Sequence, residues 1–244
     1  MTKIYERFEP ASRFIGGFTD NDGTIEFYGR INSIVNENST VVDLGAGRAA
    51  WFEDDECDYR RNLRALKTKV KCVIGLDVDN VVLTNKSTHE NRLIENGKLP
   101  LKNESVDVLI ADYVFEHISD PEQFSSEIQR VLKPGGILCA RTPHLVNYVS
   151  LGASALPNRL HAFILNRIQP GRKEQDVFPT VYKLNTLSTL RSHFANFKDF
   201  SYIFRPDPSY YGGNKSLYRI AKVFHQHMPV VFCGIIFVYS IKDE

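Results

Sequence analysis

Short apolar runs alternate with amphipathic stretches along most of the chain, and this alternation predicts the fold. The strand-like runs occupy residues 40–44, 70–77, 93–94, 106–112, 137–141, 199–204 and 230–239. Strands that alternate with helical stretches favour a mostly parallel sheet with helices on both faces. We therefore expect a Rossmann-like, doubly wound α/β fold around a seven-stranded sheet. The last run has no helix after it, so it is expected to insert at a sheet edge or to pair antiparallel.

The clearest helix start is the sequence DPEQ at residues 120–123. Asp120 can accept free backbone N–H groups, Pro121 suits the first turn, and Gln123 holds the capping-box position. The apolar residues that follow share one helical face: Phe124, Ile128, Val131 and Leu132. The sequence KPGG at residues 133–136 then predicts the end of this helix and a turn into the next strand. Residues 48–69, in part, and 187–197 are also expected to be helical.

Length and charge narrow the class of protein. The 244 residues can bury one large α/β core, so a single domain is expected. Lys and Arg total 30, and Asp and Glu total 29. This balance leaves no electrostatic footprint for nucleic acid, so nucleic-acid binding is not expected.

Three of the four cysteines, Cys72, Cys139 and Cys233, lie in apolar runs, and no C-x-x-C pair occurs. They are interpreted as buried, reduced thiols, which indicates a cytoplasmic protein. No Cys/His cluster has metal-ligand spacing, so no metal site is predicted. The N-terminal residues lack the apolar core of a secretory signal, and the apolar run at 230–239 is too short to span a bilayer.

The strongest chemical signal is the run VVDLGAGRAA at residues 41–50. Gly45 and Gly47 bracket a tight strand-to-helix turn, where glycine permits unusual φ angles and a close approach of backbone to ligand. Asp77 ends the second strand, where a carboxylate can accept hydrogen bonds from ribose hydroxyls. This pattern alone fits a nicotinamide dinucleotide as well as another nucleoside cofactor.

Three further features distinguish between these cofactors. Asp43 precedes the first glycine by two residues, where a carboxylate can face an ammonium group. The dinucleotide fingerprint prefers an acidic residue about 20 residues after its glycines. Asp77 lies further along the chain than that. The third feature is an independent downstream motif, LPLKNESVDVLIADYVFEHISDPEQFSSEIQRVLKPGG, at residues 99–136.

Together, DLGAGR, GLDVD, LPLKNESVDVLIADYVFEHI and RVLKPGG resemble the motifs of class I S-adenosylmethionine (SAM)-dependent methyltransferases. The flanking pieces GGFTDNDGTIEFYGR, RTPH, PNRLHAFIL and QPGRKEQDVFPTVYKLNT are similar to a bacterial subgroup associated with polysaccharide and cell-surface glycan biosynthesis. The resemblance implies an N-terminal lid or helical segment (1–39), a SAM-binding core (40–142), an acceptor-side insertion (143–198) and final strands (199–244). S-adenosylhomocysteine (SAH) would be the product.

The resemblance also implies roles for individual residues. The residues expected to line the methionine and ribose of SAM are Asp43, Gly45, Ala46 and Gly47. Asp77 would bind the ribose hydroxyls, Val78 would lie against the adenine, and Glu95 or Asn96 would meet the adenine edge. The family usually has Asp where Glu95 stands. Asp112 and Tyr113 would lie under the methyl-bearing sulfur, followed by His117, which is interpreted as structural.

The acceptor side has candidate residues of its own. Methyl transfer to a hydroxyl benefits from a positioned base, and His161 with Asp176 is the favoured pair. His144 is a further candidate, although the related subgroup usually has Asn there. Tyr28 and Arg30 are expected to close over SAM, with Arg30 meeting the methionine carboxylate.

The favoured function is O-methylation of a sugar, glycan or related small metabolite. A SAM-binding regulatory or partner protein without turnover stays open as an alternative, and a nicotinamide-dependent oxidoreductase is a weaker one. Residues 163–168 contain an apolar stripe that is interpreted as core-facing. The alternative for that stripe, contact with a lipid-linked glycan, keeps a peripheral membrane association open.

Overall fold

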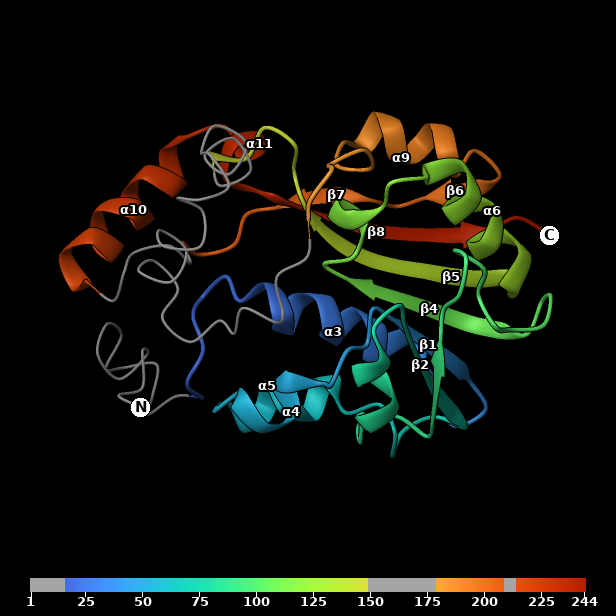
Figure 1. The fold of residues 1–244 in the computed structure, drawn as a ribbon. Coiled ribbons are helices and arrows are strands. Elements are labelled where there is room, and N and C mark those ends of the chain that lie inside the picture. The colour runs from blue at the N-terminus through green and yellow to red at the C-terminus, as the bar shows by residue number, and fades with distance from the viewer. Residues whose placement is uncertain (1–15, 149–178, 209–213) are drawn as a thin grey trace. The chain divides into compact units, whose positions relative to one another are not determined.

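The computed structural model describes residues 16–148, 179–208 and 214–244 (Figure 1). The chain groups into two compact units. We call them the sheet unit, formed by Thr24–Thr142, Thr180–Tyr202 and Ile236–Glu244, and the small unit, formed by Met1–Gly23, Pro143–Pro179 and Ile203–Ile235.

The described residues form an eight-stranded sheet. Its strands are β1 (Thr40–Leu44), β2 (Cys72–Asp77), β3 (Glu90–Leu93), β4 (Val106–Asp112), β5 (Leu132–Pro143), β6 (Phe197–Asp199), β7 (Tyr202–Phe204) and β8 (Ile235–Lys242). The strand order is β3-β2-β1-β4-β5-β8-β6, and β7 pairs with β8. The first five strands pair in parallel, whereas β6 is antiparallel to β8. The expected Rossmann-like sheet is confirmed, with one more strand because residues 197–204 form two short strands.

Helices connect the strands and cover the sheet. The described helices are α3 (Gly23–Ile34), α4 (Ala50–Asp54), α5 (Asp58–Arg64), α6 (Pro121–Val131), α9 (Leu187–His193), α10 (Lys215–His227) and α11 (Val230–Cys233), with 3-10 turns η1 (Asn80–Thr84) and η2 (Phe115–His117). Figure 1 shows α3, α4 and α5 on one face of the sheet and α6 and α9 on the other. The doubly wound arrangement is therefore present in the sheet unit.

The core lies on both faces of the central strands. Leu76 and Leu109 are fully buried, as expected for parallel strands covered on both sides. Phe27 and Ile31 of α3 are fully buried, as is Ile128 of α6. Burying an apolar side chain of this size contributes about 1.5–3 kcal/mol. These contacts therefore hold α3 and α6 against the sheet and keep the strand ends in place.

The helix start at Asp120 forms as predicted, but its surroundings differ in two ways. The Gln123 N–H donates to Asp120 Oδ1 at 3.0 Å, which is the expected cap. The Gln123 side chain, however, donates to the Asn96 carbonyl at 3.0 Å instead of completing a capping box. Helix α6 ends at Val131 as expected, but the expected turn at 133–136 lies within β5, as a bulge where its register with β4 shifts.

The apolar run at 230–239 is not the single strand that the sequence predicts. Its first part is α11, which begins after Pro229, and β8 follows only from Ile235. Proline pre-sets the φ angle of a first helical turn, which favours this helix start. Gly234 joins the two elements, and a Cβ there would lie 2.6 Å from the Val230 carbonyl oxygen. The antiparallel pairing of this segment with β6 is confirmed, but β8 lies between β5 and β6 rather than at an edge.

All four cysteines are reduced. Cys139 and Cys233 are buried as expected, whereas Cys72 is only half-buried because it begins β2. Cys57, outside the apolar runs, is buried instead. None of the helices in the described ranges is long and apolar enough to cross a bilayer.

Candidate cofactor site at the ends of β1, β2 and β4

The turn after β1 is built by glycine at two left-handed positions. Gly45 has φ +72° and Gly47 has φ +48°. A Cβ on Gly45 would lie 2.5 Å from Val114 Cγ2, so a side chain there meets both backbone strain and a clash. The N–H groups of Gly45 and Ala46 both donate to the Leu76 carbonyl, at 2.7 and 3.1 Å. The turn is therefore locked onto the end of β2.

Asp77 lies at the centre of this floor. One of its carboxylate oxygens accepts the Gly47 N–H at 2.9 Å, and the other accepts the Asp79 N–H at 3.0 Å. Its side chain is buried, and each oxygen keeps a further lone pair for a hydroxyl group. The structure thus brings the glycine turn and this carboxylate together, as the sequence predicts.

The loop after β3 borders the same floor. The Ile94 N–H donates to the Asp77 carbonyl at 2.7 Å, which ties the start of the loop to the end of β2. Asn96 has φ +52°, and Glu95 forms an isolated bridge with Lys98. Val78, after Asp77, leaves 65% of its surface exposed and offers a flat apolar contact.

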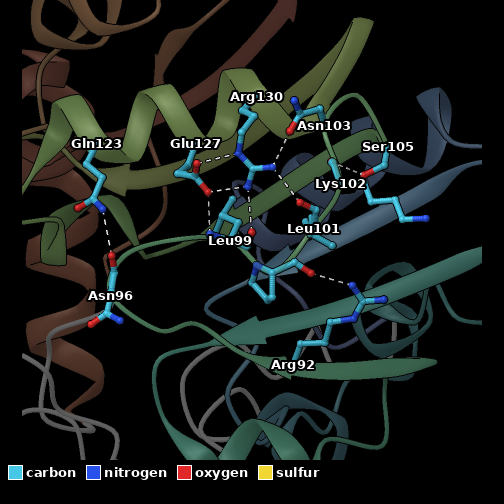
Figure 2. A network of polar contacts seen from close by, with 11 residues as sticks. Arg92, Asn96, Leu99, Leu101, Lys102, Asn103, Ser105, Gln123, Glu127 and Arg130 are labelled. Carbon is cyan, nitrogen blue, oxygen red and sulfur yellow. Dashed lines mark hydrogen bonds and ion pairs between the residues drawn. The ribbon is translucent and has the colours of Figure 1, made fainter.

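A polar network on α6 holds this loop in place (Figure 2). The Arg130 guanidinium donates to the carbonyls of Leu99 and Leu101 at 2.9 and 2.8 Å. Glu127 accepts the Leu99 N–H at 2.8 Å and pairs with Arg130 at 2.7 Å. The hydrogen bond to Arg130 lowers the pKa of Glu127, so the pair is charged at neutral pH. The position of Asn96 is thus set from α6, a cause that no local motif reveals.

The end of β4 forms a second, more highly charged part of the site. Asp112 accepts the Tyr28 hydroxyl at 3.1 Å, pairs with Arg64 at 3.4 Å and receives both Nε and Nη2 of Arg141. Burial alone raises the pKa of Asp112, but the Arg141 guanidinium outweighs it and holds that pKa below its usual value. Burial raises the pKa of Tyr28, and the Asp112 charge raises it further. Asp112 is therefore a paired carboxylate that anchors α3 and α5 to β4.

Arg64 is the main residue that the sequence analysis missed. Its guanidinium lies over the Trp51 ring at 4.8 Å and over the Tyr28 ring at 5.2 Å. Its Nε is buried without a hydrogen-bond partner among the described residues, although one end of the guanidinium reaches Asp112. A buried, unsatisfied donor costs about 1–3 kcal/mol, so it is a natural contact for an incoming anion. Residue 64 belongs to no recognised motif and reaches the site only because α5 ends there.

Asp43 faces the same space as Arg64. The pocket between them is lined by Tyr28, Asp43, Trp51, Arg64, Leu66, Val73, Ser87 and Ile110 and encloses about 10 Å³. That volume is about one water molecule. Burial raises the pKa of Asp43 to about 7; Arg64 opposes this rise, while Asp112 and Asp77 add to it. An ammonium group placed there would restore the ionised form.

Comparisons with known proteins show similarity to methyltransferases over part of the chain. Residues 57–140 match the family described as "Methyltransferase domain". The chain is similar to a protein named a probable S-adenosylmethionine-dependent methyltransferase from Mycolicibacterium smegmatis, with 39% identity over 38% of each chain. It is also similar to malonyl-[acyl-carrier protein] O-methyltransferase 1 of Coxiella burnetii, with 32% identity over 42% of this chain and 33% of the other.

The matched segment, residues 57–140, contains β2, β3 and β4 and most of β5. The chain spans little more than a third of the length of the curated relatives it matches. Among solved structures, the [4+2]-cyclase SpnF has the same fold, with a TM-score of 0.53 and 15% identity over 89% of this chain and 81% of the other.

Arg30 is not among the described residues that line the pocket. The Arg30 guanidinium pairs with Glu26 at 2.6 Å and lies 5.5 Å from the centre of the Tyr202 ring. Tyr28, two residues earlier on α3, does line the pocket. Residues 28 and 30 lie about 200° apart around a helix, so they cannot both face the sheet.

Tyr113 and His117 follow Asp112 along the chain. Tyr113 has φ +58°, leaves 40% of its surface exposed and lies 5.0 Å from the Arg141 guanidinium. His117 ends η2, where its N–H donates to the Val114 carbonyl. Tyr113 therefore presents a ring beside Asp112, whereas the described contact of His117 is with its own turn.

A buried polar cluster ties the end of the acceptor-side insertion to the sheet unit. Thr142 donates to a Glu116 carboxylate oxygen at 2.8 Å, and Asn185 donates to Thr142 at 2.7 Å. The N–H groups of Val181 and Tyr182 donate to the Glu116 carbonyl. These contacts hold residues 181–185 against η2 and β5. The sequence analysis did not single out any of the five residues that make them.

The candidate bases are in a different situation. His161 and Asp176 lie outside the described residues. His144 is in the small unit, where burial lowers its pKa and favours the neutral ring. Its Nδ1 accepts the Val146 N–H at 3.3 Å, which puts the ring proton on Nε2 in the neutral form. Within the described part of the chain, no three metal-ligating side chains gather.

Proposed function

We propose that this protein is a SAM-dependent methyltransferase that transfers a methyl group to a hydroxyl of a sugar, glycan or related small metabolite. The observation that carries the proposal is the glycine turn locked onto Asp77 beside a pocket containing both a carboxylate and an unsatisfied guanidinium. A sulfonium nucleoside with an amino-acid tail needs these groups together. The match to the methyltransferase family supports the same conclusion.

The polar groups suggest how SAM would be held. Asp77 would bind the ribose hydroxyls above the turn formed by Gly45, Ala46 and Gly47. Val78 would lie against the adenine, with Glu95 or Asn96 at its edge. Each hydrogen bond to a charged group contributes about 1.5–3 kcal/mol, so Asp77 would dominate the nucleoside end.

The methionine end would use groups from different elements. Asp43 would face the ammonium group. Arg64 would replace Arg30 as the partner of the carboxylate, because among the described residues Arg64 combines a position in the pocket with a buried, unsatisfied donor. The pocket holds about one water, so SAM would enter by displacing the guanidinium from between Trp51 and Tyr28.

The reaction needs little chemistry from the protein itself. Bound SAM supplies a methyl group that is already activated by its sulfonium. The residues at the ends of the strands orient the acceptor for in-line attack, which can contribute several kcal/mol. A base that accepts the hydroxyl proton would add a rate factor of about 10²–10⁴, and His161 oriented by Asp176 remains our candidate. His144 is the weaker candidate, because its Nδ1 already accepts a backbone N–H.

A sugar or glycan acceptor is proposed from the motifs that flank the SAM-binding core, from GGFTDNDGTIEFYGR to QPGRKEQDVFPTVYKLNT. Methylation at oxygen is consistent with the Coxiella burnetii relative, which is named as an O-methyltransferase. The balanced charge of the chain favours an uncharged or small acceptor over nucleic acid.

A second candidate is a SAM-binding protein without methyl transfer. The observation in its favour is that SpnF, a cyclase, shares the fold, so the fold alone does not fix the reaction. The two functions differ in one product: only a methyltransferase converts SAM to SAH in the presence of an acceptor.

The experiment that tests the proposal measures binding and turnover separately. Calorimetry with SAM should give a one-site isotherm that Asp77→Asn weakens strongly. Asp58→Asn is the matched control, because Asp58 is an exposed carboxylate on α5. SAH release is then measured with a panel of nucleotide sugars and glycans. No binding of SAM at millimolar concentration would overturn the proposal, and binding without SAH release for any acceptor would favour the second candidate.

A further inference from the structure

Helix α10 in the small unit leaves a row of apolar side chains exposed. The exposed fractions are 48% for Leu217, 66% for Ile220, 57% for Val223 and 60% for Phe224. Leu217, Ile220 and Val223 follow one another at intervals of three residues, and Phe224 lies four residues after Ile220, so all four share one side of the helix. We call these four residues the α10 stripe. Soluble proteins expose single apolar residues freely, but a contiguous row indicates a binding surface.

The opposite side of α10 already has its partners. Tyr218 and His225 are buried. The His225 ring lies 3.1 Å from the Tyr148 hydroxyl and 3.2 Å from the Pro206 carbonyl oxygen. Lys222 pairs with Asp20 at 3.4 Å. Because these contacts hold the helix to the small unit, the α10 stripe is not needed to pack it.

The charge of α10 indicates the chemistry of the partner. Its sequence KSLYRIAKVFHQH contains Lys215, Arg219 and Lys222 and no acidic residue. Lys222 is committed to Asp20 and Asp207, whereas Arg219 is exposed beside the stripe. Exposed apolar side chains next to cationic groups are typical of helices that lie in the interface of an anionic bilayer.

We propose that α10 docks on the surface of a bilayer that contains anionic phospholipids. The stripe enters the boundary between headgroups and acyl chains, and Arg219 pairs with lipid phosphate. A purely apolar protein partner would not require the basic flank, and an acidic protein partner would not require the exposed apolar row. The proposal does not depend on methyl transfer, because none of these residues belongs to the cofactor site.

The test uses flotation of the full chain with two kinds of vesicle. One is phosphatidylcholine alone, and the other also contains phosphatidylglycerol. The wild-type protein should float with the anionic vesicles and much less with the neutral ones, and salt should weaken binding. The double variant Ile220→Ser with Phe224→Ser should lose binding, and Arg219→Gln should retain only part of it. Phe200→Ser is the matched control, because Phe200 is also 60% exposed but lies outside α10.

A second measurement places the stripe itself in the lipid. The native chain has one tryptophan, Trp51, so Phe224→Trp adds a single reporter. Anionic vesicles should shift the emission of Phe224→Trp to the blue and leave that of Phe200→Trp unchanged. Failure of the wild type to float, or unchanged flotation of the double variant, would overturn the proposal. A dimer in solution that the double variant dissociates, without vesicle binding by the wild type, would instead assign the stripe to a second copy of the chain.

Discussion

The floor of the cofactor site and the charged pocket beside it are built in different ways. The floor is a backbone structure, in which Gly45, Ala46 and Gly47 donate N–H groups to β2. The pocket is formed by side chains, in which Asp112 accepts hydrogen bonds from Tyr28 and Arg141 and pairs with Arg64. These three partners come from other elements. The backbone geometry of a turn is determined by a few consecutive residues. The geometry of side-chain contacts depends on how elements far apart in the sequence pack. The floor could therefore be predicted from the sequence, whereas the contacts that join Asp112 to Tyr28, Arg64 and Arg141 could not.

The largest expected effect comes from breaking the side-chain region. Asp112→Ala leaves the buried guanidinium of Arg141 without its main partner, which costs about 3–5 kcal/mol of unfolding free energy. Chemical denaturation measures this change. Asp58→Ala is the control, since its ion pair with Arg61 is on the surface and should contribute at most about 1 kcal/mol. Equal losses for the two variants would mean that Asp112 does not anchor the pocket.

The next effect distinguishes Arg64 from Arg30 within the same region. Arg64→Gln should weaken SAM binding by about 1.5–3 kcal/mol, because a charge-assisted bond to the carboxylate is lost. Binding of methylthioadenosine, which lacks the amino-acid tail, should not change. Calorimetry with both ligands checks this split. Arg30→Gln is the matched control and should leave both affinities intact; the reverse result would restore the role that the sequence predicts for Arg30.

Adding a single methyl group at Gly45 is expected to disrupt the backbone region. Gly45→Ala adds a Cβ at φ +72° that meets Val114 Cγ2, and we expect a loss of about 1–3 kcal/mol in unfolding free energy and weaker SAM binding. Adding Val114→Ala should relieve the clash but not the backbone strain. Gly29→Ala is the control, because that position in α3 has open space and should gain about 0.5–1 kcal/mol. Thermal and denaturant unfolding distinguish these outcomes.

The same difference between local and tertiary causes explains which other elements of the fold could be predicted from the sequence. The central parallel strands and the Asp120 cap follow from local patterns, and they are confirmed. The apolar pattern at 230–239 is equally consistent with a short helix and a strand, so α11 could not be separated from β8. Gln123 was assigned to a capping box because its alternative partner, Asn96, lies across the fold.

The direction of Arg30 could not be predicted for a related reason. The periodicity of α3 is compatible with either Tyr28 or Arg30 facing the sheet, and only the tertiary contact with Asp112 selects Tyr28. Arg64 gave no signal at all, since α5 has no motif and its end is positioned by Trp51 and Tyr28. Residues that act through packing are thus the ones that local reasoning misses.

Asp43 belongs to both regions, because it lies on the motif strand but faces the charged pocket, and its effect is gradual because it is spread over several pH units. Its folded pKa of about 7 exceeds an unfolded value near 3.9. Between about pH 4 and 7 the folded state therefore holds more protons, so the stability that protonated Asp43 contributes is complete below about pH 4 and is lost as pH rises to about 7. The slope is at most about 1.4 kcal/mol per pH unit and should vanish in Asp43→Asn. SAM affinity should follow the opposite trend and weaken as pH falls below 7, because the ammonium group needs the ionised carboxylate. Methylthioadenosine should show no such dependence. A SAM affinity that is flat from pH 5 to 8 in the wild type would remove Asp43 from the site, whatever the floor proves to bind.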